Sequence, residues 1–92
     1  MSKRCLMLKG DDNVALALED LAPGDLLQAD GIKVTMRQPV EFGHKFAVRG
    51  IKKGEAILKH GEIIGRATSD IEAGEHVHVH NVESLRAKKE RK

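Results

Sequence analysis

A short glycine-containing pattern occurs three times along this chain, and it constrains the fold more than any other feature of the sequence. In each copy an apolar residue is followed by two variable residues, a glycine and an acid. Because glycine adopts positive φ at little cost, each copy predicts a strand, a tight turn and a second strand. The unequal spacing of the copies favours one turn type reused within a compact domain over a solenoid of fixed period. The copies are ALEDLAPGDLL at 17–27, AVRGIKKGEAIL at 47–58 and ATSDIEAGEHV at 67–77.

The segments around these turns are short, apolar and rich in β-branched residues, and several alternate with period two. Gly, Pro and Asp residues separate them, as in ADG at 29–31 and QP at 38–39. Short alternating segments separated in this way predict an all-β fold, either a barrel or a clip, with almost no helix. The predicted strands are VALAL at 14–18, IKVTM at 32–36, FAVRG at 46–50, AILKH at 56–60, EIIG at 62–65 and HVHVH at 76–80.

The core of this chain must be small and aliphatic. With 92 residues the chain fits one compact domain that leaves much of its surface exposed. Two Phe, no Trp and no Tyr leave Val, Ile, Leu and Ala to fill the interior. We expect the core to consist mainly of Val14, Leu16, Leu18, Leu21, Val34, Val48, Ile51, Ile57, Ile63, Ile71, Val77 and Val79.

Charge and cysteine usage exclude several classes of protein. The formal net charge is only +2, and seven of the sixteen Lys and Arg residues lie in the first four and the last seven positions, as in RAKKERK at 86–92. Without aromatic or glycine-rich partner elements, this tail favours a solvated terminus over a nucleic-acid site. Cys5 is the only cysteine, and the apolar run CLML at 5–8 is too short for a signal peptide or a membrane span. We therefore expect a cytoplasmic protein without nucleic-acid or membrane partners.

The run GEHVHVHN at 74–81 is the first candidate for chemistry. In a strand, His76, His78 and His80 project from one face, while the two valines between them point into the core. Neighbouring same-face side chains are roughly 7 Å apart, so two imidazoles can converge on one Zn²⁺, Fe²⁺ or Mn²⁺. In a straight strand the first and third histidines lie about 13 Å apart, too far to share an ion. The spacing leaves open a metal site or a solvated histidine face.

The second candidate is EFGHKF at 41–46, which contains His44 and Lys45. An imidazole beside a cation is kept available as a base, and a lysine can hold a carboxylate substrate. A loop histidine beside a solvated lysine is the alternative interpretation. His60, in KHGE at 59–62, is predicted to be a turn residue without a chemical role.

These blocks together resemble a known family. DNVALALEDL at 12–21, GIKV at 31–34 and the segment from FGHK to HVHVHN at 42–81 are similar to the small N-terminal SAF domain of altronate and galactarate dehydratases. The resemblance implies an SAF-type β-clip over residues 11–82. An N-terminal strand or arm at 1–10 and a basic tail at 83–92 would flank it.

The resemblance also implies a function. Members of the family remove water from a sugar acid with a divalent metal such as Fe²⁺ or Mn²⁺, and a larger C-terminal region supplies most of the active site. This chain then resembles a stand-alone small subunit whose partner is a larger catalytic subunit. His44 and Lys45 would be catalytic, His44, Lys45 and His78 would bind substrate, and His76 and His78 would bind metal.

Two alternatives stay open at this point. SAF domains also occur as carbohydrate- or protein-binding modules without catalysis. The small subunit of a sulfolactate sulfo-lyase resembles this chain as well. Altronate, galactarate, other aldarates and sulfolactate all carry a carboxylate beside a hydroxylated carbon, so the substrate is not identified by the sequence.

Overall fold

A computed structural model describes residues 5–6, 12–29, 32–78 and 80–84 of the chain. These residues form strands and turns and contain no helix, and so none that could cross a membrane. The all-β prediction is confirmed. The strands are β1 (Cys5–Leu6), β2 (Val14–Ala17), β3 (Leu26–Ala29), β4 (Ile32–Thr35), β5 (Lys45–Ala47), β6 (Ala56–Lys59), β7 (Glu62–Ala67), β8 (His76–Val77) and β9 (Val82–Ser84).

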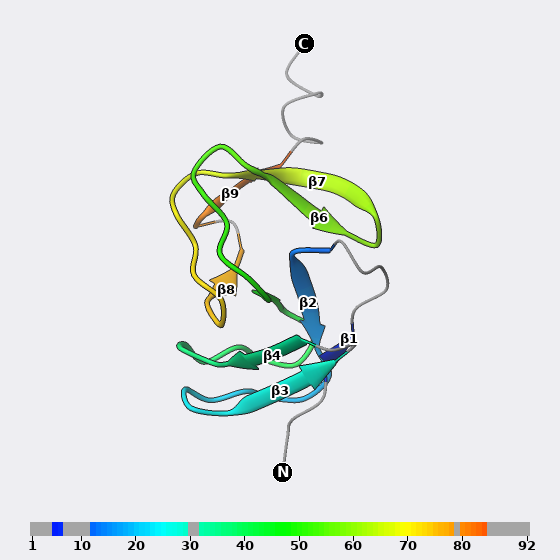
Figure 1. Cartoon of the computed structure of the whole chain (residues 1–92), viewed down its shortest axis with the longest axis vertical. Coiled ribbons are helices and arrows are strands. Elements are labelled where there is room, and N and C mark those ends of the chain that lie inside the picture. Colours follow the sequence, from blue (N-terminus) through cyan, green and yellow to red (C-terminus); the bar gives the residue numbers. More distant parts are fainter. Residues whose placement is uncertain (1–4, 7–11, 30–31, 79, 85–92) are drawn as a thin grey trace.

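The described strands pair into three antiparallel sheets. The central sheet has the order β1-β2-β5-β8, the hairpin β3-β4 forms the second sheet, and β6-β7-β9 forms the third. Figure 1 shows the hairpin at one end of the molecule and β6, β7 and β9 at the other, with β2 and β8 between them. In the central sheet Lys45 pairs with Val77 and Phe46 with His76. This register places the segment before β5 beside the segment after β8.

The central sheet buries both of its faces. Val14 belongs to one hydrophobic cluster of the described residues and its neighbour Ala15 to the other. Phe46 and Ala47 divide between the same two clusters. Successive side chains of a strand point to opposite faces, so β2 and β5 form a wall between two cores. The first cluster is Ala15, Ala17, Leu21, Leu27, Val34, Met36, Val40, Phe46 and Val48, and the second is Val14, Ala47, Ile51, Ile57, Ala67, Ile71 and Val77.

Within the described residues the glycine turn occurs four times, once more than the sequence pattern predicted. The turns are residues 22–25, 41–44, 52–55 and 72–75, and the third residue of each is a glycine with φ between 87° and 92°. In every copy the fourth residue donates its backbone N–H to the carbonyl of the first. The glycine N–H donates to the carbonyl of a residue on another segment, and that residue donates its own N–H back to the carbonyl of the fourth turn residue. These outside residues are Met36, Ala17, Ala67 and Ala47 in turn order.

The four turns associate in two pairs. Isolated bridges join Leu21 to Val40 and Ile51 to Ile71, the residues that precede the turns. An aspartate reinforces each bridge: Asp20 accepts a hydrogen bond from the backbone of the turn at 41–44, and Asp70 accepts one from the turn at 52–55. The chain therefore uses one supersecondary unit twice, once on each side of the central sheet.

Two buried polar residues hold the β6-β7 hairpin. Asp12 accepts hydrogen bonds from the backbone N–H groups of His60 and Gly61, and Asn13 bonds to the backbone of Ala56 and Leu58. His60 and Gly61 both have positive φ, at 60° and 75°, as a two-residue type I′ hairpin requires. The prediction that His60 is a turn residue is confirmed.

Most of the predicted core is buried. Leu16 and Leu18 are only half-buried, and Val79 lies outside the described residues. Ile63 was wrongly assigned to the core, since it is 53% exposed. An irregularity in the β6-β7 pairing leaves Ile64 between the paired residues Ile63 and Gly65, so that Ile64 turns towards the second cluster instead. The confirmed residues are Val14, Leu21, Val34, Val48, Ile51, Ile57, Ile71 and Val77, and the sequence missed Leu27, Met36, Val40 and Phe46.

We expect Ile51→Ala and Ile71→Ala each to lower the free energy of unfolding by ~2–5 kcal/mol, because both side chains are 1% exposed. Ile63→Ala is the matched control and should change it by less than about 0.5 kcal/mol, since its side chain is exposed. Urea unfolding at equilibrium measures all three. Equal losses in the three variants would contradict the packing described here.

Candidate functional site

Three histidines from distant parts of the sequence form a cluster. His44, His76 and His78 each place a ring nitrogen within 4.8 Å of the corresponding atoms of the other two. Nδ1 of His44 lies 3.0 Å from Nε2 of His76, and the three ring centroids are 5.2–5.3 Å apart. His44 ends the turn before β5, His76 lies in β8 and His78 follows β8. The antiparallel pairing of β5 with β8 brings them together.

The predicted strand at 76–80 is wrong, because β8 ends at Val77. Asn81 is buried and bends the chain back: its side chain donates to the carbonyl of His76 and accepts from the N–H of His78. Its own N–H donates to the carbonyl of His78. The bend places the ring centroid of His80 5.5 Å from that of His76, much closer than a straight strand allows. His80 nevertheless does not belong to the three-histidine group.

The turn at 72–75 fixes the start of β8. Gly74 donates to the carbonyl of Ala47 and accepts from the N–H of Arg37, so this turn is bonded both to β5 and to the segment after β4. A Cβ on Gly74 would collide with the carbonyl oxygen of Thr35, which makes the absence of a side chain necessary here. The backbone N–H of His76 donates to the side chain of Gln38. The backbone that carries His76 is therefore held from two directions.

His44 owes its orientation to the turn at 41–44. In the other three turns the fourth residue is Asp25, Glu55 or Glu75, and its carboxylate accepts the backbone N–H of the first turn residue. At 41–44 this position is a histidine, and its ring contacts His76 instead. The fourth residue of this turn thus contributes its side chain to the cluster, whereas in the other three turns it caps the turn backbone.

The pKa of His76 lies below its ordinary value of 6.5. Burial is the largest cause, and the nearby imidazoles of His44, His78 and His80 add to it because each would carry the same charge. Glu41 acts in the opposite direction. His76 is therefore neutral at neutral pH and keeps a ring lone pair for a proton or a cation.

The three histidines fit a divalent transition metal. Imidazole nitrogen suits Zn²⁺, Fe²⁺ and related ions, and three protein ligands leave positions open for water or substrate. Two nitrogens at ~2.1 Å from one ion and at right angles lie about 3.0 Å apart. The 3.0 Å separation of His44 Nδ1 from His76 Nε2 agrees with that geometry, and it also agrees with a hydrogen bond between the rings.

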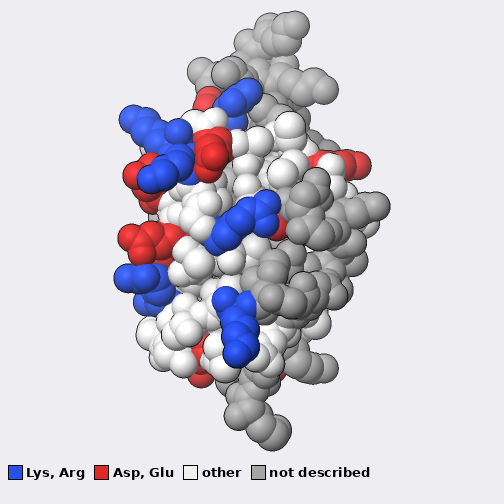
Figure 2. Space-filling model, in the orientation of Figure 1, with Lys and Arg blue, Asp and Glu red and all other residues white. Residues whose placement is uncertain are grey.

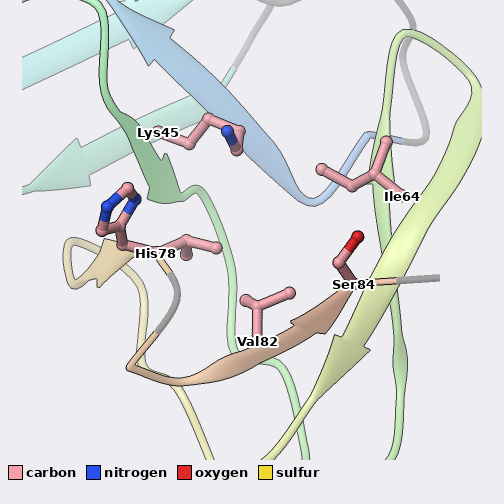
Figure 3. A pocket seen from close by; sticks show the side chains of 6 residues that line it. Lys45, Ile64, His78, Val82 and Ser84 are labelled. Carbon is pink, nitrogen blue, oxygen red and sulfur yellow. The ribbon is translucent and has the colours of Figure 1, made fainter. Parts of the chain in front are cut away.

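An open pocket of about 300 Å³ lies beside the cluster. Lys45, His78 and Ser84 provide its polar groups, and three aliphatic side chains complete the lining (Figure 3). His78 belongs both to this pocket and to the histidine cluster. A molecule in the pocket can therefore contact the Lys45 ammonium and the cluster together. The aliphatic lining residues are Ile64, Val77 and Val82.

The charged side chains of the face in Figure 2 are mixed in sign. Acidic and basic groups lie next to one another on this face. Among the described residues, Arg37 and Glu72 form an ion pair at 2.8 Å, with both side chains largely exposed. Exposed pairs of this kind contribute little to stability.

Comparison with known proteins identifies the family of the chain. The family described as the altronate/galactarate dehydratase SAF domain matches residues 3–85, and the chain belongs to this family. It is 40% identical over 82 residues to altronate dehydratase of Bacillus subtilis and 54% identical over 70 residues to that of Escherichia coli. These matches cover 89% and 76% of the chain but only 16% and 14% of the two dehydratases.

A relative of similar length also matches. The chain is 34% identical over 83 residues to the (2R)-sulfolactate sulfo-lyase subunit alpha of Chromohalobacter salexigens. That match covers 83% of the chain and 88% of the relative. This relative is named as a subunit of a lyase.

The structure brings the predicted site residues together in one region. His44, His76 and His78 form the cluster, and Lys45 reaches the same region through the pocket that it shares with His78. Their roles in substrate and metal binding stay predictions. Sequence reasoning missed Glu41, whose Oε1 lies 3.9 Å from Nε2 of His44. The available signal was VEFGH at 40–44, a fourth glycine turn with histidine in the place of the acid.

We expect the imidazole of His76 to titrate below pH 6.5, and His44→Ala to move its midpoint upwards by removing one like-charged neighbour. Because the unfolded state takes up this proton first, His76 destabilises the fold as the pH falls through about 6.5. NMR titration of the ring signals measures the midpoint. His60→Asn removes an imidazole outside the cluster and should leave it unchanged. An unshifted midpoint in the His44 variant would contradict the proposed coupling.

Proposed function

We propose that this chain is the small subunit or N-terminal domain of a sugar-acid dehydratase of the altronate or galactarate type. In this proposal it supplies substrate- and metal-binding side chains to an active site that a larger partner completes. The observation that carries the proposal is the convergence of His44, His76 and His78 beside the pocket of Lys45. The relationship to altronate dehydratases supports the class of reaction.

Lys45 and the imidazoles have complementary tasks in such a dehydration. The Lys45 ammonium binds the substrate carboxylate in the pocket, which brings the adjacent carbon towards His78 and the cluster. A neutral imidazole, with His44 as the first candidate, removes the proton next to the carboxylate. The hydroxyl on the next carbon leaves as water once it is protonated, and the resulting enol becomes a 2-keto acid. One proton is thus taken and one is given, so the enzyme returns to its starting state.

A divalent metal belongs to the proposal. His76 and His78 would hold it, with His44 as the third ligand or as the base. The lowered pKa of His76 favours this role because a ligand must present a lone pair. Bound Fe²⁺ or Mn²⁺ would supply positive charge to stabilise the developing enediolate and the departing hydroxyl.

Several features support a larger catalytic partner. The cluster and pocket lie at the surface, with His78 exposed, so water reaches them in the chain alone. Phe42, next to the glycine of the turn that carries His44, is 65% exposed, and exposed aromatic residues are frequent anchors of interfaces. The altronate dehydratases are several times longer than the segment that matches this chain. We place the assembled enzyme in the cytoplasm, in keeping with one cysteine in the sequence.

A second candidate function is that of a sulfolactate sulfo-lyase small subunit. The specific observation in its favour is length, because the match covers 88% of the subunit alpha from Chromohalobacter salexigens. The same residues suit both reactions, since sulfite in place of water would leave from the carbon next to the deprotonated one. The two candidates differ in the leaving group and share the carboxylate contact of Lys45.

We expect the isolated chain to bind Mn²⁺ or Zn²⁺ weakly, because the described cluster supplies only three ligands on an open surface. His76→Ala and His78→Ala should each weaken this binding at least about tenfold, since each removes one ligand. Calorimetric titration measures the affinities, and His60→Asn is the control because His60 lies in the β6-β7 turn. Equal affinity in all these proteins would identify the cluster as a solvated polar edge.

The proposed function is tested by reconstitution with the large subunit of a dehydratase or of a sulfo-lyase. The chain alone should be inactive, and the mixture should release water from altronate or galactarate, or sulfite from sulfolactate. Lys45→Ala should raise KM more than about tenfold through loss of the carboxylate contact, whereas Lys33→Ala, an exposed lysine of β4, should not. Phe42→Ala should weaken subunit association. If the large subunit is fully active without the chain, the proposal is wrong and a non-catalytic binding module replaces it.

A further inference from the structure

The two ring nitrogens of His44 have different neighbours. Nδ1 faces Nε2 of His76 at 3.0 Å, inside the cluster. Nε2 lies on the other side of the ring, 3.9 Å from Oε1 of Glu41. Glu41 is the first residue of the turn and His44 the fourth, and the backbone hydrogen bond from His44 to the carbonyl of Glu41 keeps them together. The ring therefore lies between an imidazole and a carboxylate.

The carboxylate distinguishes the two neutral tautomers of His44. An ionised carboxylate only accepts hydrogen bonds, so it favours the form in which the proton is on Nε2. That form leaves a lone pair on Nδ1, pointing at His76. The opposite form would place two lone-pair-bearing groups, Nε2 and the carboxylate, against each other. The 3.9 Å separation is too long for a hydrogen bond, so the preference arises from the field of the charge.

We infer that Glu41 is a positioning residue for His44: it selects the Nε2–H tautomer, so that Nδ1 offers its lone pair to the centre of the cluster. In histidine sites of metalloproteins a carboxylate often takes this place, holding the ring nitrogen that does not bind the ion. At 41–44 the turn supplies both groups, because its first residue is an acid and its fourth a histidine. The inference goes beyond the proposed function, since it concerns the protonation of one ring and holds in the chain alone.

A comparison inside the molecule supports this assignment. The turn at 72–75 also begins with an acid, Glu72, but its fourth residue is Glu75, whose carboxylate bonds to the turn backbone. Glu72 pairs with Arg37 on the surface. Of these two turns, only the turn at 41–44 therefore places its first-position acid beside an imidazole of its fourth residue.

The test reads the tautomer directly. Long-range ¹H–¹⁵N correlation spectra of the labelled chain at pH about 8, above the usual histidine pKa of about 6.5, distinguish protonated from unprotonated ring nitrogens. We expect wild-type His44 to carry its proton on Nε2. Glu41→Ala should raise the Nδ1–H fraction several-fold, and Glu41→Gln should lie between, because its amide oxygen still accepts. Glu72→Ala, the same change at the same turn position, should leave His44 as in the wild type.

Zn²⁺ titration provides the second measurement. Glu41→Ala should weaken Zn²⁺ binding about tenfold, while Glu72→Ala should not. Since the Glu41 side chain is 84% exposed, neither change at this position is expected to disturb folding. A wild-type His44 protonated on Nδ1, or an Nε2–H form that survives Glu41→Ala unchanged, would overturn the inference. If wild-type chain binds no Zn²⁺, the proposed metal role fails, and the tautomer measurement alone decides the role of Glu41.

Discussion

The fold depends on the reciprocal hydrogen bonds between each glycine turn and the segment against which it lies. A turn that closes on itself still leaves the glycine N–H and the next carbonyl without partners, and buried backbone groups require them. Here one residue of a distant segment satisfies both groups in all four described turns. Three of these residues are alanines, whose small side chains let the backbones approach closely. Short strands of two to six residues can therefore form a stable domain, because the turns pair the segments that the strands are too short to hold.

The hydrogen bonding of the glycine turns also explains where a site residue can be placed at little cost to the fold. At 22–25, 52–55 and 72–75 the fourth residue uses its carboxylate to accept the backbone N–H of the first turn residue. At 41–44 the backbone bonds and the carboxylate of Asp20 hold the turn without a cap from its fourth residue, and His44 is available to the cluster. Departures from a local rule are often found at functional sites, where another requirement outweighs stability. Among the four described turns, the turn without an acid at its fourth position is the turn that carries His44.

The sequence predicts the fold class because turn glycines and period-two alternation both follow from local backbone chemistry. It predicts less well where side chains from distant segments change the local outcome. The side chain of Asn81 bonds to the backbone on both sides of Val77, and β8 is only two residues long. The alternation of His and Val in the sequence does not reveal this. The irregular pairing of β6 with β7 exchanges Ile64 for Ile63 in the core. Phe46 is buried because the central sheet is covered on both faces, and Val40 because its bridge to Leu21 places it in the same cluster; one segment alone shows neither. The candidate residues His44, His76 and His78 are visible in the sequence, but their contact depends on the β5-β8 register.

Burial and the neighbouring imidazoles of the cluster disfavour a positive charge on His76 by lowering its pKa. Three imidazoles within a few ångströms of one another repel if protonated, and the fold lowers the pKa of His76 instead of pairing it with an acid. The carboxylate of Glu41 lies beside Nε2 of His44, so that Nδ1 of the same ring faces Nε2 of His76. Ring nitrogens without a proton would bind a cation through their lone pairs. The arrangement therefore supports the proposed metal role, and β8, which carries His76, lies at the edge of the central sheet.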